Sequence, residues 1–491
     1  MGVFSSKPAK PAPVPTDTII PLHWQDDNST FRAIVTTIML RFDDVLDPEK
    51  LQTSLATLME MGDWRKLGAR LRMNESGKLE YHVPESFDAK RPAFKYTHVK
   101  YETSISEHSL ASKLPRSTTR PTVLGSPDDF RSLSQDPDTP TKIDDYLFSD
   151  VGQLSLRIVS FNDAMLVSLT WPHTLMDAMG RRALLDAWIS VLSGRKSEVP
   201  SLHGFDKDPL TTFGTQPSES YALANQLMKG FAFFTFSVRM AFELMWYSKD
   251  EHRVVCLPAT HFNSMKSTAL SELSTLCSEP EQKQFISDGD IICSWWARLA
   301  LSMVPRNTKR NISLMNAYGL RTILSDLLPA DKAYISNASN EVFTIFPAYV
   351  LFTHPVSYTA SLIRRSIVEQ STRSQREALA ALTRQSQASS GRSPMFGDGS
   401  TKLIVFSNWT KARFFELDFS AAVVKEGIPL EKRKHGLGRP SYMQSSAFTN
   451  GFPMRNAFPI YGKDAEGNYW FSGTLRTETW KTIEDEFTNK Y

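Results

Sequence analysis

The sequence predicts an α/β fold divided between two domains. The clearest sign is a strand, a turn and a helix that follow one another between Ala164 and Leu192. Apolar residues alternate along 165–171, as in a half-buried strand, and recur at helical spacing along 183–191. The chain has 491 residues, too many for one ordinary core, so we expect two domains of roughly 200 to 250 residues each.

The elements before this unit also alternate between strands and helices. Residues 31–42 are predicted as a strand, and Asp47 begins a helix over 47–61 whose leucines share one face. Strands at 67–73 and 79–83 flank a turn. Residues 115–141 are rich in Pro, Ser, Thr and Asp without an apolar period, which predicts a long surface loop.

The middle of the chain is predicted to connect the two domains. A strand at 154–161 is expected to pair with the strand that follows it, and residues 193–219 resemble a connector. The apolar run 231–247 is short for a bilayer and contains two charged residues. We expect an aromatic-rich helix buried in, or lying across, the domain junction; contact with a membrane surface is the less favoured alternative.

The second half repeats the alternation. It is predicted to contain a strand at 253–258, a helix from His261, a capped helix at 291–304, a single charged helix at 362–382 and a Ser/Gly-rich loop at 385–401. The resulting division is a disordered leader at 1–30, an N-terminal domain at 31–215, an aromatic-rich crossover at 216–250 and a C-terminal domain at 251–491.

Composition narrows the classes of function and the compartment. The net charge of +3 argues against a dedicated nucleic-acid binder. Cys256, Cys277 and Cys293 form no C-x-x-C pattern, which favours buried free thiols in a reducing compartment. No secretory segment opens the chain, so we expect a cytoplasmic protein. Gly2 fits an N-myristoylation pattern; an unmodified tail fits equally well, and one acyl chain would bind membrane only marginally.

His173 is the first candidate for catalysis because it follows the end of a strand. A histidine acts readily as a general base, since its ordinary pKa lies near neutrality. Asp177, four residues on, could orient the ring or anchor the turn elsewhere. The same spacing recurs from His23 to Asp27, without a strand before it or a helix behind it. We interpret that copy as chance, in a solvated entry to the first strand.

Two distant segments together resemble the BAHD acyltransferases, which use acyl-CoA donors. The first is WPHTLMDAMG at 171–180, similar to the family's HxxxDG motif. The second is FSNW at 406–409 followed by DFSAA at 418–422, similar to the family's [ST]-x-W run and DFGWG motif. Smaller similarities follow in order at 319–322 with 334–338 and at 438–440. The pattern is most similar to the fungal branch, which acylates hydroxyl groups of secondary metabolites.

The sequence departs from the family pattern at two points. Ala178 replaces the glycine of HxxxDG, and Gly180 follows two residues later. Only Asp418 and Phe419 remain of DFGWG. The turn that the family's glycines shape is therefore expected to differ here.

The resemblance implies two chloramphenicol-acetyltransferase-like α/β domains with a solvent channel between them. His173 would lie at its middle, with acyl-CoA entering from one face and an alcohol from the other. Ser407 would stabilise the tetrahedral intermediate beside Trp409. Neither a metal nor a permanently bound cofactor is required, and acetyl-CoA is the expected co-substrate. A monomer is expected.

The resemblance also implies structural residues near the site. Asp177 would pair with an arginine and fix the loop that contains Gly180, and Asp418 would do similar work against Arg321. The basic segment 432–435 lies near Arg439, and Lys432 and Arg439 are its candidates for contact with CoA phosphates. The alternative is that these are solvated charges on a loop.

Two other functions remain open at this point. The same scaffold could acylate an amine, or it could be a non-catalytic binding protein with a BAHD-like fold. The sequence does not specify whether the acceptor is a terpenoid, a polyketide or an alkaloid, because loops set specificity.

Overall fold

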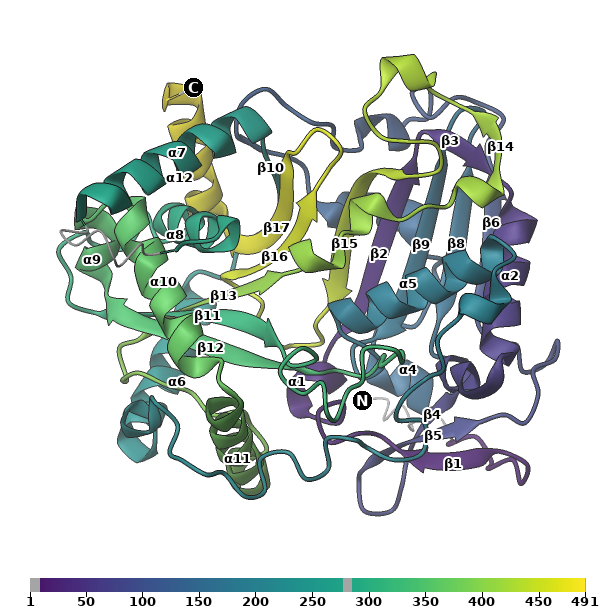
Figure 1. Cartoon of the computed structure of the whole chain (residues 1–491), viewed down its shortest axis with the longest axis horizontal. Helices are drawn as coiled ribbons and strands as arrows, with labels where there is room; N and C mark the ends of the chain where they lie inside the picture. Colours follow the sequence, from purple (N-terminus) through teal and green to yellow (C-terminus); the bar gives the residue numbers. More distant parts are fainter. Residues whose placement is uncertain (1–8, 277–284, 491) are drawn as a thin grey trace, which may run out of the picture.

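The computed structural model describes residues 9–276 and 285–490, in which two large mixed sheets lie side by side (Figure 1). In these ranges, one sheet has five strands, in the order β15 (Pro440–Phe448), β2 (Val35–Phe42), β9 (Met165–Pro172), β8 (Ser155–Ser160) and β6 (Lys95–Lys100). The other has seven, in the order β12 (Ser339–Pro347), β11 (Asn311–Gly319), β13 (Lys402–Asn408), β16 (Ala457–Lys463), β17 (Tyr469–Arg476), β10 (Asp250–Leu257) and β7 (Thr122–Val123). Two small sheets join β1 (Thr18–Pro21), β5 (Leu79–Val83) and β4 (Arg70–Met73), and β14 (Val423–Glu426) with β3 (Asp44–Leu46).

Helices cover the two large sheets separately. Beside the five-stranded sheet lie α2 (Pro48–Glu60) and α5 (Ala178–Leu192), and the short helix α3 (Arg131–Ser134) packs on β9 and β2. The short helix α4 (Ile143–Leu147) packs on β4, and α1 (Ser29–Arg32) precedes β2. Beside the seven-stranded sheet lie α7 (Ala259–Leu276), α8 (Asp288–Ala300), α9 (Ala348–Thr353), α10 (Val356–Gln370) and α12 (Thr477–Lys490), with α6 (Gly230–Trp246) and α11 (Arg373–Ser390) below them in Figure 1. The predicted α/β class is confirmed.

The central strand β9 is buried along its whole length rather than on one face. All eight of its residues are buried. The reason lies in residues 115–141, which we predicted as a surface loop. This segment contains β7 and α3, and α3 packs on β9 and β2 with Phe130 and Leu133 buried. The prediction of a surface loop was therefore wrong. Two apolar side chains three residues apart, Phe130 and Leu133, are enough to pack this segment on the sheet.

The two halves of the chain exchange strands. From the second half, β15 pairs antiparallel with β2, and β14 pairs with β3. From the first half, β7 pairs with β10. Phe419 accompanies β14 and β15 and packs edge-on against Phe42 and Trp188. A division of the chain at 216–250 would leave each half with its own strands, whereas β7, β14 and β15 each pair with a strand from the other half.

Several predicted boundaries differ from the observed ones. The strand predicted at 31–42 is β2, which begins at Val35. Residues 29–32 instead form the short helix α1, which Asn28 caps. The single helix predicted at 362–382 is instead α10 and α11, since the Thr372 hydroxyl accepts a hydrogen bond from the N–H of Gln375 and starts a new helix. That helix ends at Gly391, in the left-handed region, so the loop predicted from residue 385 begins later.

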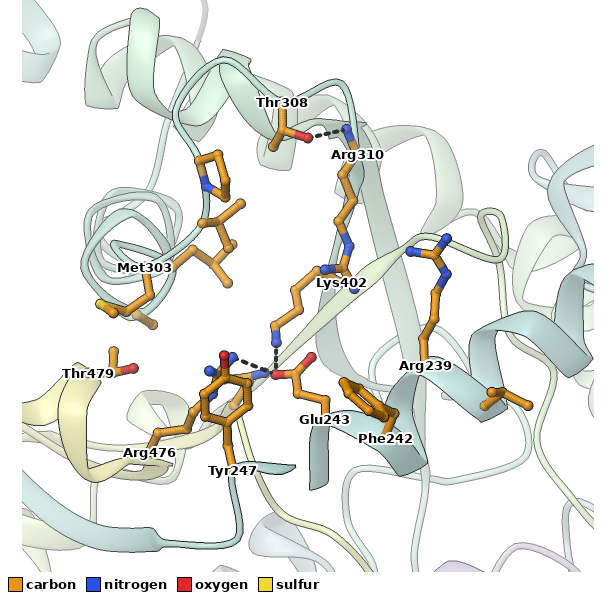
Figure 2. A pocket seen from close by; sticks show the side chains of 16 residues that line it. Arg239, Phe242, Glu243, Tyr247, Met303, Thr308, Arg310, Lys402, Arg476 and Thr479 are labelled. Carbon is orange, nitrogen blue, oxygen red and sulfur yellow. Dashed lines mark hydrogen bonds and ion pairs between the residues drawn. The ribbon is translucent and has the colours of Figure 1, made fainter. Parts of the chain in front are cut away.

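The crossover helix α6 lies at the outer side of the seven-stranded sheet, away from the five-stranded one (Figure 1). The prediction of a helix buried in the junction was wrong, since Phe236 is its one fully buried side chain. Figure 2 shows Glu243 turned toward Lys402 and Arg476, so a half-buried ion-pair cluster attaches the helix. In the part of the chain that the structure describes, no helix combines the length and apolarity needed to cross a bilayer.

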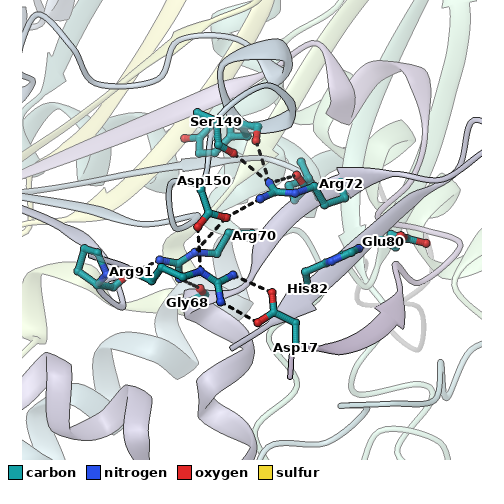
Figure 3. Close-up of polar contacts among 12 residues, drawn as sticks. Asp17, Gly68, Arg70, Arg72, Glu80, His82, Arg91, Ser149 and Asp150 are labelled. Carbon is teal, nitrogen blue, oxygen red and sulfur yellow. Dashed lines mark hydrogen bonds and ion pairs between the residues drawn. The ribbon is translucent and has the colours of Figure 1, made fainter. Parts of the chain in front are cut away.

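The predicted disordered leader is largely ordered from residue 9 onward. It contributes β1, and Arg91 binds both carboxylate oxygens of Asp17 at 2.8 and 2.7 Å (Figure 3). Arg91 and Arg72 also donate to Asp150, so this charged cluster is paired internally. The prediction of a disordered leader was wrong because it rested on the proline content, whereas the order comes from contacts with distant residues such as Arg91. Gly2 lies outside the described residues.

The predicted free thiols are confirmed for two of the three cysteines. Cys256 and Cys293 are free and buried, while Cys277 lies outside the described residues. Burial raises the pKa of both described thiols.

The start of α5 packs tightly on the segment that leads into β12, and Gly180 makes this possible. A Cβ at position 180 would overlap the backbone carbonyl of Ile335. We predict that Gly180→Ala lowers the free energy of unfolding by about 1–3 kcal/mol, because a backbone carbonyl cannot turn aside as a side chain can. Urea unfolding measures this. The matched control is Gly319→Ala, whose new Cβ would have no heavy atom within 4 Å; equal losses in both variants would contradict the argument.

Candidate active site

His173 lies directly after β9, at the level where β2 begins. Its backbone N–H donates to the carbonyl of Ile34 at 2.9 Å. Its ring stacks on Phe31, with centroids 4.3 Å apart and planes 8° apart. The residue is half-buried, and Nδ1 is enclosed without a hydrogen-bond partner in the described residues. One face of the ring is therefore covered by Phe31, and one of its two nitrogens is enclosed.

The surroundings of His173 favour a neutral imidazole. Burial lowers its pKa below the ordinary 6.5, and the positive charge of Arg181 acts in the same direction. Its own carbonyl, Asp177 and Asn337 oppose this shift but do not cancel it. At neutral pH the ring can therefore accept a proton.

Asp177 caps α5 and does not orient the histidine ring. Its Oδ1 accepts from the N–H of Gly180 at 2.8 Å and from Arg321 at 2.9 Å. Its Oδ2 accepts from Arg321 and from the N–H of Ala338, both at 2.9 Å. Burial alone would raise the pKa of Asp177, but Arg321 and the two amides hold it below its usual value. The carboxylate is thus ionised and fully occupied.

A second network, which the sequence did not reveal as a site, holds the backbone of His173. The side-chain amide of Asn337 donates to the carbonyl of His173 at 3.0 Å and to Asp26 at 2.7 Å. The backbone N–H of Asn337 also donates to Asp26, at 2.8 Å. Asn337 falls in the 334–338 segment that resembles the family, so a signal for it existed. Nothing in the sequence singled out Asp26.

The region around His23 is buried, which corrects the prediction of a solvated entry. His23 Nδ1 lies 3.0 Å from the hydroxyl of Tyr334, and the two rings stack. Burial lowers the pKa of His23 to about 2 and raises that of Asp26 to about 7. The segment is polar in sequence but is enclosed by partners from the second half of the chain.

Ser407 and Trp409 lie at the end of β13 and contact each other directly. The indole N–H of Trp409 donates to Ser407 Oγ at 2.8 Å, and the indole stacks on Tyr461. A serine hydroxyl that accepts one hydrogen bond keeps its own O–H to donate elsewhere. Ser407 is half-buried, so that donor can reach a bound molecule.

Arg181 connects this pair to α5. It is almost fully buried, and its guanidinium lies 4.4 Å from the ring centroid of Trp409 and 4.2 Å from that of Phe414. Burial lowers the pKa of Arg181 to about 9. Sequence reasoning missed this residue, because a charged side chain next to Gly180 on a helix is ordinarily expected to face solvent. It places the Ser407 segment against the helix that Asp177 caps.

Asp418 does not meet Arg321, contrary to the prediction. Asp418 is exposed, and its Oδ1 accepts from the N–H of Ser420 at 3.0 Å, which closes a local turn. Arg321 is committed to Asp177 and also donates to the carbonyls of Tyr334 and Ser336.

The basic loop between β14 and β15 divides into paired and exposed residues. Arg433 binds both carboxylate oxygens of buried Asp44 at 2.9 and 2.6 Å, and His435 contacts Asp43 at 3.1 Å. These two are therefore not solvated loop charges. Lys432 and Arg439, the predicted CoA contacts, are exposed on the same loop.

Comparisons with known proteins agree on one family. A model of the Transferase family matches residues 139–424, more than half of the chain. The chain is 44% identical to the transcriptional regulator calD of Penicillium decumbens, covering 99% of this chain and 98% of that protein. It is 41% identical to the acetyltransferase adrJ of Penicillium roqueforti, covering 99% of both.

A solved structure supports the fold. The chain resembles TRI101 of F. sporotrichioides, crystallised with coenzyme A and T-2, with a TM-score of 0.64 and 16% identity over 96% of this chain and 98% of that one. The predicted family is confirmed. The chain belongs to the Transferase family, the BAHD-type acyl-CoA-dependent O-acyltransferases, and to its fungal secondary-metabolite branch.

Proposed function

We propose that this acyltransferase moves an acetyl group from acetyl-CoA to a hydroxyl of a terpenoid, polyketide or alkaloid, with His173 as general base. The observation that carries the proposal is the setting of His173. Burial keeps the ring neutral, Phe31 fixes its plane, and Asn337 holds its backbone. Because Nδ1 is enclosed, we assign proton transfer to Nε2.

The chemistry then needs no covalent enzyme intermediate. The reaction takes place in a channel between the two domains. Nε2 of His173 accepts the proton of the acceptor's hydroxyl group while the hydroxyl oxygen attacks the thioester carbonyl carbon. The carbonyl oxygen becomes an oxyanion, and the Ser407 hydroxyl donates to it while Trp409 holds Ser407 in place. One such hydrogen bond contributes about 3 kcal/mol. The C–S bond breaks, and His173 returns the proton to the CoA sulfur.

Residues outside the reacting atoms complete the proposal. Asp177 and Arg321 fix the turn after His173, and exposed Lys432 and Arg439 meet the phosphates of CoA. The protein acts as a cytoplasmic monomer. A myristoyl group on Gly2 would add weak membrane contact.

Two alternatives lead to different measurements. The name of calD favours a non-catalytic role, and an amine would use the same base. A non-catalytic protein would not turn over a thioester, so thiol release distinguishes that alternative from the proposal. Turnover with an amine but not with an alcohol would identify an N-acyltransferase.

Replacing the base tests the mechanism directly. We expect His173→Ala to lower acceptor-dependent thiol release from acetyl-CoA by about 10²–10⁴-fold, because no other group removes the acceptor proton. The control His354→Ala, between α9 and α10, should keep full activity. Equal release from wild type and His173→Ala would reject His173 as the base. If wild type is silent with acetyl and longer donors across a panel of alcohols, the non-catalytic alternative gains support.

The pH profile tests the environment of the base. A general base works unprotonated, and burial lowers the pKa of His173, so activity should fall only below pH 6.5 as acid protonates the ring. The readout is kcat/KM against pH. Phe31→Ala opens one face of the ring to water and should move the midpoint up toward 6.5. A wild-type midpoint at or above 6.5 would contradict the assignment.

The oxyanion donor is tested by removing one hydroxyl. We expect Ser407→Ala to lower kcat by about 10²-fold with little change in KM, because the hydrogen bond forms in the transition state. Ser407→Thr keeps the hydroxyl and should retain most activity. A change confined to KM would show that Ser407 binds substrate instead.

A further inference from the structure

The helix α6 carries a continuous apolar row on its exposed face. Met245 is 80% exposed, Phe231 79% and Trp246 70%. Trp246 stacks on Phe242, and Phe231 lies next to Phe234, so the rings of the row contact one another and leave their outer surface exposed. The exposed large apolar residues of the helix are Phe231, Phe234, Val238, Phe242, Met245 and Trp246. Their spacing is three to four residues, except for the adjacent pair Met245 and Trp246, and it places the row along one side of the helix. A surface helix ordinarily turns polar residues outward, so this face is built to be covered.

The charge around this row is positive. Both acidic residues of segment 229–250 are occupied: Glu243 accepts from Arg476 at 2.9 Å and from Lys402, and Asp250 accepts from Arg455 at 2.8 Å. The cations of the same segment, Lys229, Arg239 and Lys249, are exposed at its start, middle and end. The unpaired charge of the segment is therefore positive, with one cation before the helix, one at its middle and one after it.

A pocket of about 620 Å³ opens beside the row and extends the same charge pattern. Figure 2 shows its lining, in which Phe242 and Met303 supply apolar surface. Its charged lining consists of Arg239, Arg310, Lys402 and Arg476 against the single carboxylate of Glu243. The pocket is lined by neither His173 nor Ser407, so it is separate from the proposed active site. An anionic group with an apolar neighbour complements it.

We infer that α6 docks on the surface of an anionic lipid bilayer. The helix lies flat, with its apolar row at the boundary between headgroups and acyl chains and its cations against lipid phosphates. Trp246 and Tyr247 have an apolar body and a polar tip, which suits this boundary. The inference is independent of the proposed acyl transfer.

A second copy of the chain fits this face less well. Two copies of α6 packed antiparallel about a two-fold axis would bring Lys229 of one near Lys249 of the other, and Arg239 near its own counterpart. Like charges would then meet at both ends and at the centre. An anionic membrane meets the same cations with opposite charge.

Vesicle co-sedimentation of the full chain tests the inference. Wild type should bind vesicles of phosphatidylcholine mixed with phosphatidylserine more strongly than phosphatidylcholine alone, and added salt should weaken this binding. The triple variant Phe234→Ser, Phe242→Ser and Trp246→Ser should lose about tenfold or more of its partitioning. The control Val368→Ser, on α10 and 63% exposed, should bind as wild type does.

A charge variant keeps the test decisive if the triple variant does not fold. Arg239→Gln with Lys249→Gln should reduce binding to phosphatidylserine vesicles by about fivefold per cation and leave thermal unfolding and thiol release unchanged. Absence of binding by wild type, or binding that neither variant alters, would overturn the inference. So would a concentration-dependent dimer in solution that the triple variant abolishes, since a second copy would then be the occupant.

Discussion

The carboxylate of Asp177 is the contact through which the start of α5 binds the second half of the chain. It receives four hydrogen bonds, from Arg321 twice and from the backbones of Gly180 and Ala338. Removing a carboxylate and a guanidinium from water is costly, and the cost is recovered only when each acceptor position is filled in good geometry. Three of the four bonds come from Arg321 and Ala338, so this one carboxylate ties the start of α5 to the second half of the chain.

Asp177 anchors the start of α5 and leaves the orientation of the His173 ring to other residues. In sequence, the spacing of His173 and Asp177 suits a carboxylate that orients an imidazole. In the structure, Asp177 is occupied by other donors, and His173 is held through its ring by Phe31 and through its carbonyl by Asn337. A carboxylate directly against the ring would favour the charged imidazolium. Because Asp177 is engaged elsewhere, burial dominates, the pKa of His173 is lowered and the imidazole is neutral.

The sequence revealed what local pattern determines and missed what distant contacts determine. The unit around His173 and Gly180 could be predicted because periodicity, capping and motif spacing are all local. The partner of Asp177 could not, because Arg321 lies 144 residues away. Burial of Asp26 and the exchange of β15 into the first sheet depend on similarly distant pairings. The position of α6 was predicted wrongly. Its apolar composition indicates that one face will be covered, but it does not indicate which surface covers that face.

One departure from the family pattern is a displaced glycine, and the other is the loss of both glycines of DFGWG. Ala178 replaces the expected glycine, yet the close approach occurs at Gly180, where any side chain would strike the carbonyl of Ile335. In the late motif, Phe419 still packs in the first domain's core. Gly438, in the separate segment 438–440, has a φ of +64° and passes close to the backbone of Ser420. A Cβ at position 180 or 438 would overlap backbone atoms, so the close packing at the start of α5 and beside Ser420 depends on glycine at these two positions.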